Sequence, residues 1–277
     1  MRFVRFLHNG YPHLGVKTPD GVRLIGPHAL EDLLRMGVDL STYAKNPDGP
    51  VVEIAEDAFL PPLTRPGKIM CVGLNYLDHT KESNFEQPSY PTLFPRFSNS
   101  LIGHNQPVIR PVGTDSLDYE CELAVVLKKG GRRIPKAKAL DCVAGYSPFN
   151  DASVREFQFK TPQWTMGKNF DNTGAFGPEF VTADELPEGG RGLTIETRVN
   201  GEVLQSANTN DMVFDVATII ELLSEVMTLE AGDLIVSGTP AGVGFARTPQ
   251  HFMHGGDVVE VAIEGFDVLR NPVIDER

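Results

Sequence analysis

Three carboxylates are the residues whose types and spacing most directly suggest chemistry. Glu120 and Glu122 lie in a largely apolar run that predicts a strand from Tyr119 to Leu127. Because side chains alternate along a strand, the two glutamates share one face, where their charges repel unless a cation lies between them. Asp151 ends a second apolar run, and three carboxylates together would suit a hard divalent cation. The alternative is the solvated face of an edge strand, and this pattern alone leaves both open.

A histidine and a glutamate form a second candidate pair. His79 and Glu82 lie three apart in a polar segment, residues 74–87, which we expect to be helical in part. On a helix they would share a face, and a carboxylate beside an imidazole orients the ring and raises its basicity, as a general base requires. The segment directly follows a short predicted strand that ends at Gly73, which favours a functional site. The alternative is a surface helix with a chance ion pair.

Cationic and amide side chains complete the candidate set. Lys168 follows a glycine and is flanked by aromatic residues, so it is a candidate for a partly buried cation aimed at an anion. The alternative is a surface lysine. Arg155 and Gln158 follow Asp151 by four and seven residues. On a helix that begins after Asp151 they would share a face near the carboxylates, where Arg155 can bind a carboxylate through two parallel hydrogen bonds.

The composition limits the classes of partner. The chain has 277 residues, of which 41% are hydrophobic and 22% charged, values typical of a soluble globular protein. A formal net charge of −12 argues against nucleic acid or an anionic membrane as partner. We expect a small-molecule substrate, whose negative charge a metal or local cations would neutralise.

The cysteines and the apolar runs bear on location. Three widely spaced cysteines without a C-x-x-C pair fit a reducing compartment better than a disulfide framework. The first residues lack the apolar stretch of a signal peptide, and no run approaches the roughly 20 apolar residues that span a bilayer. We therefore expect a cytoplasmic protein without a membrane segment.

Turn signals and prolines divide the chain into two expected domains, a small N-terminal β-rich domain at 1–62 and a catalytic domain at 63–277. Asn9-Gly10 and Asp20-Gly21 are strong turn signals, and they separate three predicted strands. These strands are expected at 3–7, 14–17 and 22–25, followed by a short helix with Leu30, Leu33 and Leu34 on one face. A proline-rich segment, residues 60–67, is expected to end regular structure there.

The second part of the chain reads as a large sheet assembly. Asn200-Gly201 between residues 194–199 and 202–205 is the clearest hairpin signal. Apolar residues at helical spacing predict a helix over 216–227, with Asp215 as its N-cap. Strands dominate and no steady strand–helix alternation is present, which predicts an α+β fold rather than a doubly wound one.

Several motifs in one order resemble the fumarylacetoacetate hydrolase family. The resemblance begins near residue 68 and extends to the C-terminus, with the first sixty residues similar to a variable N-terminal extension. The motifs that carry it are Asp118-Tyr119-Glu120-x-Glu122, Val143-Ala144-Gly145-Tyr146 with Asn150-Asp151, Gly167-Lys168-x-Phe170-Asp171, Val199-Asn200-Gly201-Glu202, Gly238-Thr239-Pro240-Ala241-Gly242-Val243-Gly244 and Gly256-Asp257-Val258-Val259-Glu260-Val261. The resemblance implies a large mixed β-sandwich or β-roll, a homodimer, and Mg²⁺ or Mn²⁺ in the site.

The resemblance also implies residue roles. It assigns the metal ligands to Glu120, Glu122 and Asp151, a catalytic dyad to His79 and Glu82, the active-site lysine to Lys168, and substrate binding to Tyr76, Arg155, Gln158 and Thr239.

Departures from the family pattern leave the substrate open. Arg96 stands where a lysine is frequent, and Ala152 and Val154 alter the segment after Asp151. Phe149 and residues 172–175 also depart from the pattern. We expect these positions to line the substrate pocket.

The expected activity is hydrolysis of a carbon–carbon bond in a 2,4-dioxo acid, of the acylpyruvate or fumarylpyruvate type, in the catabolism of aromatic or related compounds. The same site would serve an oxaloacetate-type decarboxylase or a 2-hydroxydienoate isomerase, which are the alternatives within enzymes. A non-catalytic binding protein is the alternative outside enzymes, but it would not require His79, Glu82 and Lys168 together.

Overall fold

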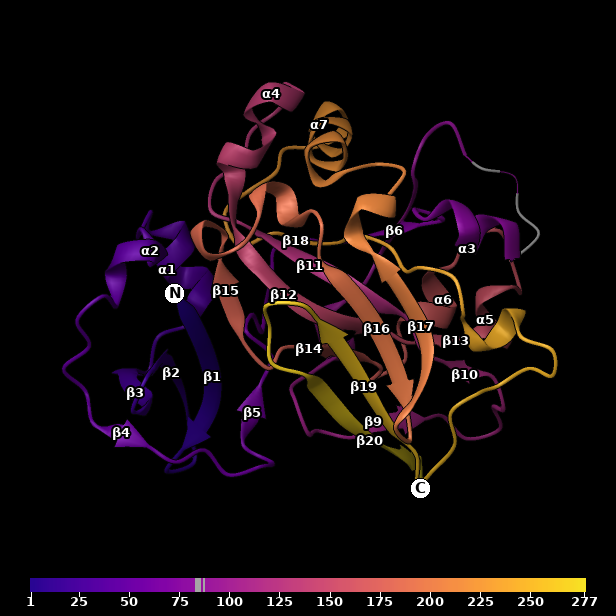
Figure 1. The fold of residues 1–277 in the computed structure, drawn as a ribbon, viewed down its shortest axis with the longest axis horizontal. Helices are drawn as coiled ribbons and strands as arrows, with labels where there is room; N and C mark the ends of the chain where they lie inside the picture. The colour runs from indigo at the N-terminus through magenta and orange to yellow at the C-terminus, as the bar shows by residue number, and fades with distance from the viewer. Residues whose placement is uncertain (83–85, 87) are drawn as a thin grey trace.

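A 13-stranded mixed sheet organises the molecule, whose computed structural model describes residues 1–82, 86 and 88–277 (Figure 1). Its main path runs β4-β3-β2-β1-β15-β12-β11-β18-β6-β7, with β5, β8 and β14 attached beside it. These strands are β1 (Arg2–His8), β2 (Tyr11–Thr18), β3 (Gly21–Gly26), β4 (Val51–Val52), β5 (Phe59–Leu60), β6 (Ile69–Gly73), β7 (Thr92–Pro95), β8 (Leu101–Ile102), β11 (Cys121–Leu127), β12 (Val143–Asp151), β14 (Gly174–Phe176), β15 (Phe180–Thr182) and β18 (Leu234–Val236). Pairing is mostly antiparallel, but β6 and β18 are parallel, as are β8 and β14.

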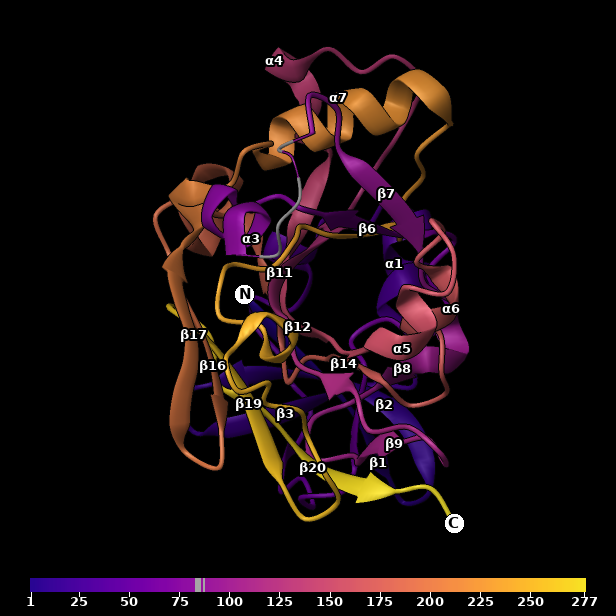
Figure 2. The same cartoon turned by 90° about the vertical axis from the view of Figure 1, so that its right-hand side faces the viewer.

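A five-stranded sheet forms a second layer beside the centre of the first, as the orange and yellow strands in Figure 2 show. Its order is β17-β16-β19-β20-β9, made of β9 (Val108–Arg110), β16 (Thr194–Val199), β17 (Glu202–Asn208), β19 (Val258–Ile263) and β20 (Leu269–Asp275). The predicted hairpin is confirmed, because β16 and β17 pair across Asn200 and Gly201, both at positive φ. A short pair, β10 (Leu117–Asp118) with β13 (Ser153–Val154), lies next to the site. The α+β prediction with mixed sheets is confirmed.

Within the part of the chain that the structure describes, the helices are short except one. They are α1 (Leu30–Arg35), α2 (Leu40–Tyr43), α3 (Leu77–Glu82), α4 (Lys136–Ala139), α5 (Arg155–Gln158), α6 (Thr165–Lys168) and α7 (Val216–Val226), with 3₁₀ turns at Ser98–Ser100, Leu140–Cys142, Ala183–Glu185, Glu188–Gly190, Thr209–Asp211 and Gly244–Ala246. The predicted long helix is confirmed as α7, and Asp215 caps it by accepting a hydrogen bond from the Thr218 N–H. Among the described residues, no helix is long and apolar enough to cross a membrane.

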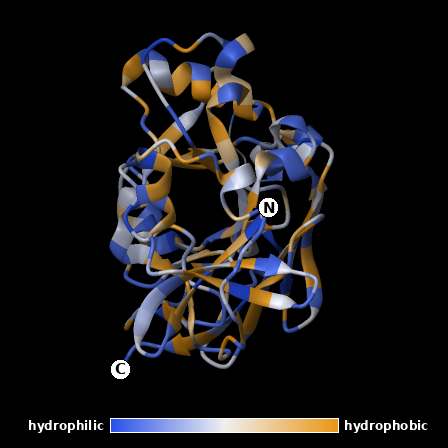
Figure 3. Cartoon of the chain, turned by 90° about the vertical axis from the view of Figure 1, so that its left-hand side faces the viewer, coloured by the Kyte–Doolittle hydropathy of each residue, from blue (hydrophilic) through white to orange (hydrophobic). Residues whose placement is uncertain are grey.

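Strand β11 lies in the interior of the large sheet and is buried on both faces. Cys121, Leu123 and Val125 pack into a core with the second sheet and α7. Ala124 and Val126 pack into another core with the N-terminal strands and α1. All seven residues of β11 are buried, and the strand is almost wholly apolar, as burial on both faces requires. Orange, apolar stretches recur along the strands drawn in Figure 3. The edge-strand alternative for the two glutamates is therefore excluded.

The N-terminal strands extend the large sheet. The three predicted strands and the leucine helix are confirmed as β1, β2, β3 and α1. Strand β1 pairs with β15 through Arg2 opposite Val181 and Phe3 opposite Phe180. The first residues therefore share a sheet with the rest of the chain, although they form a distinct lobe at the left of Figure 1. The boundary between 62 and 63 stays a prediction.

Candidate active site

The pairing of β11 with β12 brings the three carboxylates together. Cys121 lies opposite Asn150, and the Asp151 N–H donates to the Glu120 carbonyl at 2.9 Å. Glu120, Glu122 and Asp151 each offer one oxygen, and these oxygens lie within 4.8 Å of one another. All three side chains are buried, with at most 5% of a residue exposed. The register thus joins residues thirty positions apart in sequence into one acidic cluster.

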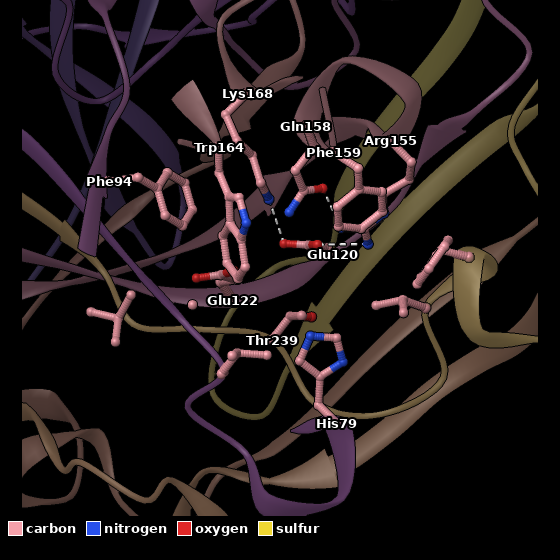
Figure 4. A pocket seen from close by; sticks show the side chains of 15 residues that line it. His79, Phe94, Glu120, Glu122, Arg155, Gln158, Phe159, Trp164, Lys168 and Thr239 are labelled. Carbon is pink, nitrogen blue, oxygen red and sulfur yellow. Dashed lines mark hydrogen bonds and ion pairs between the residues drawn. The ribbon is translucent and has the colours of Figure 1, made fainter. Parts of the chain in front are cut away.

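Two basic side chains neutralise part of this cluster. The Lys168 ammonium, at the end of α6, lies 2.7 Å from Glu120 Oε2 and 2.7 Å from Asp151 Oδ2. The Arg155 guanidinium, at the start of α5, lies 2.7 Å from Glu120 Oε1. Figure 4 shows the two cations reaching Glu120 from opposite sides. Burial alone would raise the pKa of Glu120, but Lys168 and Arg155 outweigh it and lower that pKa to about 2.

Glu122 is the carboxylate without a cationic partner among the described residues. It accepts a hydrogen bond from the Gly238 N–H. Burial, reinforced by the charges of Asp151 and Glu120, raises the pKa of Glu122 well above its ordinary value. An unneutralised buried carboxylate beside two others fits a divalent cation, and the all-oxygen donor set matches hard ions such as Mg²⁺ and Mn²⁺. The residues present therefore suit the metal that the family resemblance implies.

Asp118 holds Arg155 in place. Arg155 Nε donates to Asp118 Oδ2 at 2.8 Å, and Arg155 Nη1 donates to Gln158 Oε1 at 2.8 Å. Asp118 also accepts the N–H groups of Gly244 and Phe245, at 2.8 and 2.9 Å. The expected shared face of Arg155 and Gln158 is confirmed. The role of Asp118 was missed, although its place at the head of the Asp118-Tyr119-Glu120 motif was a usable signal.

The histidine and its glutamate form a dyad at the same pocket. His79 Nδ1 lies 3.0 Å from Glu82 Oε1, and Glu82 is held by the Gly242 N–H at 2.8 and 3.0 Å. An ionised carboxylate only accepts, so we assign the ring hydrogen to Nδ1. His79 Nε2 then carries the lone pair that can accept a proton, which is the arrangement of a general base. Residues 83–85 and 87 of the segment expected to be partly helical lie outside the described residues.

One pocket joins the dyad and the acidic cluster, with about 420 Å³ of empty space that includes some open solvent. Its polar side chains are those of His79, Glu120, Glu122, Arg155, Gln158, Lys168 and Thr239, and its apolar ones are those of Val72, Leu74, Phe94, Phe159, Trp164, Val243 and Phe245 (Figure 4). His79 lies across this pocket from Lys168 in Figure 4. Seven of the ten predicted site residues therefore line this pocket. Asp151 and Glu82 do not line it but contact the lining residues Lys168 and His79, so the structure brings nine of the ten together.

Tyr76 is the exception. It is 2% exposed and is absent from the described residues that line the pocket. Its hydroxyl is buried and has no hydrogen-bond partner among the described residues. Burial is the main reason why the pKa of Tyr76 is raised well above its ordinary value. A contact between Tyr76 and substrate stays a prediction.

The expectation that the departing positions line the pocket is wrong, because none of them is among its described lining residues: Arg96, Phe149, Ala152, Val154 and residues 172–175. Arg96 is instead buried beneath Asp151, to which its Nε donates. Its Nη1 donates to Thr173 Oγ1 at 3.3 Å, and its Nη2 donates to the Ala152 carbonyl. All three donor groups are used within the chain, so Arg96 supports a predicted metal ligand. Phe149 belongs to the core, where its ring lies 5.7 Å from that of Phe176.

Comparisons with known proteins agree with this geometry. The family model for the C-terminal domain of fumarylacetoacetate (FAA) hydrolase matches residues 68–274. The human protein named mitochondrial oxaloacetate tautomerase FAHD2A is 39% identical, over 99% of this chain and 92% of the relative.

Two solved structures are similar over the whole of both chains. Fumarylacetoacetate hydrolase from Exiguobacterium antarcticum is 35% identical with a TM-score of 0.89. Maleylpyruvate hydrolase from Sphingobium sp. SYK-6, solved with manganese(II) and pyruvate, is 27% identical with a TM-score of 0.82. The chain therefore belongs to the fumarylacetoacetate hydrolase family of enzymes.

Proposed function

We propose that this protein is a metal-dependent enzyme that interconverts the keto and enol forms of a short 2-oxo acid, oxaloacetate being the first substrate to test. The observation that carries the proposal is the His79–Glu82 dyad at the same buried pocket as the carboxylate cluster. Keto–enol interconversion requires a base that moves a proton at the carbon beside the carbonyl and a positive charge that polarises this carbonyl. The dyad supplies the base, and the carboxylate cluster would hold the cation. The name of the human relative supports oxaloacetate as the substrate.

The proposed reaction moves one proton. A divalent cation held by Glu120, Glu122 and Asp151 would supply Lewis acidity that makes the C3 hydrogens of a 2-oxo acid more acidic. His79 Nε2 removes a proton from C3, and Glu82 stabilises the imidazolium that results. The electron pair of the C3–H bond becomes the C2=C3 double bond, and the π pair of the C2 carbonyl moves to the C2 oxygen. That oxygen takes the proton back from the His79 imidazolium, directly or through water, and the enol is complete. Lys168 adds positive charge where that oxygen becomes negative.

The apolar walls of the pocket support the proposed proton transfer. Phe94 and Trp164 pack 5.6 Å apart on one side, and Phe159 and Phe245 pack 4.9 Å apart on another. Apolar walls exclude water, so charges inside the pocket interact more strongly than in solvent. Arg155 and Lys168 are the cations in the described lining, and their positive charges would attract an anionic substrate to the pocket.

Hydrolysis of a 2,4-dioxo acid is the second candidate. Similarity to the maleylpyruvate hydrolase that was solved with manganese(II) and pyruvate favours it. In that reaction His79 would take a proton from water, the hydroxide would add to C4, and the C3–C4 bond would break to give pyruvate and a second acid. A decarboxylase would use the same pocket and would release CO₂ from an oxaloacetate-type acid.

One set of assays distinguishes these activities. Protein stripped with a chelator is reloaded with Mg²⁺ or Mn²⁺ and given oxaloacetate, acylpyruvates and fumarylpyruvate in parallel. Enol absorbance, pyruvate release and CO₂ release are followed separately. We expect metal-dependent tautomerisation that falls about 100-fold or more in His79→Ala, the usual scale for a general base. Glu122→Gln should also lose activity, because it removes a proposed metal ligand. Faster cleavage of a 2,4-dioxo acid than tautomerisation would replace the first candidate by the second, and no metal-dependent turnover would refute both.

Further properties of the protein are part of the same proposal. We infer Mg²⁺ or Mn²⁺ as the resident metal, since the acidic cluster and the manganese-bound relative support a divalent ion. A homodimer and a role in the catabolism of aromatic compounds stay predictions. A cytoplasmic location also stays a prediction, and the mitochondrial location in the name of the human relative offers an alternative.

A further inference from the structure

Gln205 connects the second sheet to the site. It lies on β17 opposite Thr197 of β16 and is 1% exposed. Its side chain leaves its own sheet and reaches β11 at Cys121, between the two cluster glutamates, and the loop after β18 at Thr239 and Pro240. No motif marked this residue, because its partners are up to 84 positions away in sequence.

The orientation of the Gln205 amide follows from its neighbours. Its Oε1 accepts the Cys121 N–H at 3.0 Å and the Thr197 hydroxyl at 2.6 Å. Its Nε2 donates to the Pro240 carbonyl at 2.8 Å. A backbone N–H only donates and a carbonyl only accepts. In the reverse orientation the amide NH₂ would therefore face the Cys121 N–H, donor against donor, and the amide oxygen would face the Pro240 carbonyl, acceptor against acceptor. Four hydrogen bonds therefore hold one orientation of the amide.

This orientation determines the polarity of Thr239. The fourth hydrogen bond runs from Gln205 Nε2 to Thr239 Oγ1 at 2.9 Å. Because Oγ1 accepts there, the hydroxyl hydrogen of Thr239 is left to point elsewhere. Thr239 lines the pocket and is 3% exposed. The Cys121 thiol is the competing acceptor next to it, and sulfur accepts only weakly.

We propose that Gln205 is a positioning residue that makes the Thr239 hydroxyl a hydrogen-bond donor to an oxygen of the bound 2-oxo acid. The proposal rests on the proposed function, since it takes a 2-oxo acid as the ligand. Gln205 also ties this donor to the acidic cluster, because it holds the N–H of the residue between Glu120 and Glu122. The donor and the cluster thus keep a constant separation.

The test is binding of pyruvate to the Mn²⁺-loaded protein, measured by calorimetry. Gln205→Glu keeps the shape and the acceptor oxygen but replaces the donor to Thr239 with an acceptor, which turns the Thr239 hydrogen away from the pocket. Thr239→Val removes the hydroxyl at nearly constant shape. We expect each variant to weaken pyruvate binding roughly 10-fold, the scale of one hydrogen bond, and Thr239→Ser to retain most of the affinity.

The double variant separates a positioning role from a merely structural one. If Gln205 acts through Thr239, Gln205→Glu costs little further pyruvate affinity in the Thr239→Val background. Additive losses would overturn the proposal. Gln106→Glu is the matched control for the charge change, since its Oε1 accepts the Gly103 N–H and lies away from the pocket. It should bind pyruvate like the unaltered protein.

Two further outcomes keep the proposal refutable. If Gln205→Glu does not fold, the comparison of Thr239→Val with Thr239→Ser decides, and unchanged pyruvate affinity in Thr239→Val would overturn the proposal. Failure of the unaltered, Mn²⁺-loaded protein to bind pyruvate would refute the 2-oxo acid ligand and, with it, the proposed function. If the effects of Gln205→Glu and Thr239→Val on pyruvate affinity are not additive but the protein has no tautomerase activity, the positioning role is supported and only the proposed reaction is refuted.

Discussion

At the scale of single residues, the site is held by charges that the chain itself supplies. Lys168 bridges Glu120 and Asp151, and Arg96 neutralises Asp151 from the side away from the pocket. The side chains of Arg96 and Asp151 are both 0% exposed. Removing one partner of such a pair leaves the other charge buried and less compensated. This lowers the free energy of unfolding more than replacing both partners with apolar residues would.

Arg96→Met therefore should destabilise the metal-free protein strongly. We expect a loss of about 3–5 kcal/mol in the free energy of unfolding, measured by urea denaturation, and a smaller loss for Arg96→Lys. Arg35→Met is the control, because Arg35 pairs with Asp32 on the surface and should lose less than about 1 kcal/mol. If Arg96→Met lost as little free energy of unfolding as Arg35→Met, Arg96 would not be needed to compensate the charge of Asp151.

At the scale of elements, the pocket forms where strand ends and short helices meet. Strand β6 ends at Gly73, and helix α6 begins directly after Trp164. The Trp164 ring packs on Gly73 so closely that a Cβ there would lie 2.2 Å from the nearest ring carbon. A glycine at the strand end thus allows the aromatic wall of the pocket to close over β6.

Gly73→Ala should displace this wall. Trp164 is the single tryptophan of the chain, so its fluorescence reports the change directly. We expect emission at longer wavelength and greater quenching by a polar quencher, because the indole must move toward solvent. Gly67→Ala serves as the control, since its Cβ would meet only the end of the Asp233 side chain. Unchanged emission in Gly73→Ala would show that the ring and strand adjust without opening the pocket.

At the scale of the whole molecule, the N-terminal lobe contacts the second sheet through His104. The ring of His104 packs edge-on against Phe59 of β5, with centroids 5.0 Å apart. Its Nδ1 accepts the N–H of Arg270 in β20 at 3.1 Å, which requires an unprotonated Nδ1. Burial, aided by the charge of Arg270, lowers the pKa of His104 to about 4.

Stability should therefore fall on acidification through this histidine. The unfolded chain binds a proton near pH 6.5 and the folded chain near pH 4, so the free energy of unfolding decreases as pH falls between these values. Because His104 is partly exposed, we expect a contribution of only about 1–2 kcal/mol. His104→Gln, whose side-chain oxygen can accept the same N–H, should lose less stability between pH 7 and pH 4.5 in urea titrations. Equal losses in both proteins would contradict this linkage.

Much of the site was predictable because its key residues lie at short, regular spacings. Glu120 and Glu122 alternate on one strand, His79 and Glu82 lie one helical turn apart, and these relations hold whatever surrounds them. The hairpin at Asn200 and the helix capped by Asp215 were predictable for the same reason, since local geometry determines each.

The sequence by itself thus determined the composition of the acidic cluster and the dyad, together with the strands and helices that carry them. Only the tertiary structure decided that Lys168 bridges Glu120 and Asp151, that Arg96 lies beneath Asp151 rather than in the pocket, and that Gln205 donates to Thr239. The physical reason is that these contacts join segments 34 and 55 positions apart in the chain, through side chains whose direction depends on how the strands and loops pack. Spacing along the chain carries no information about such directions.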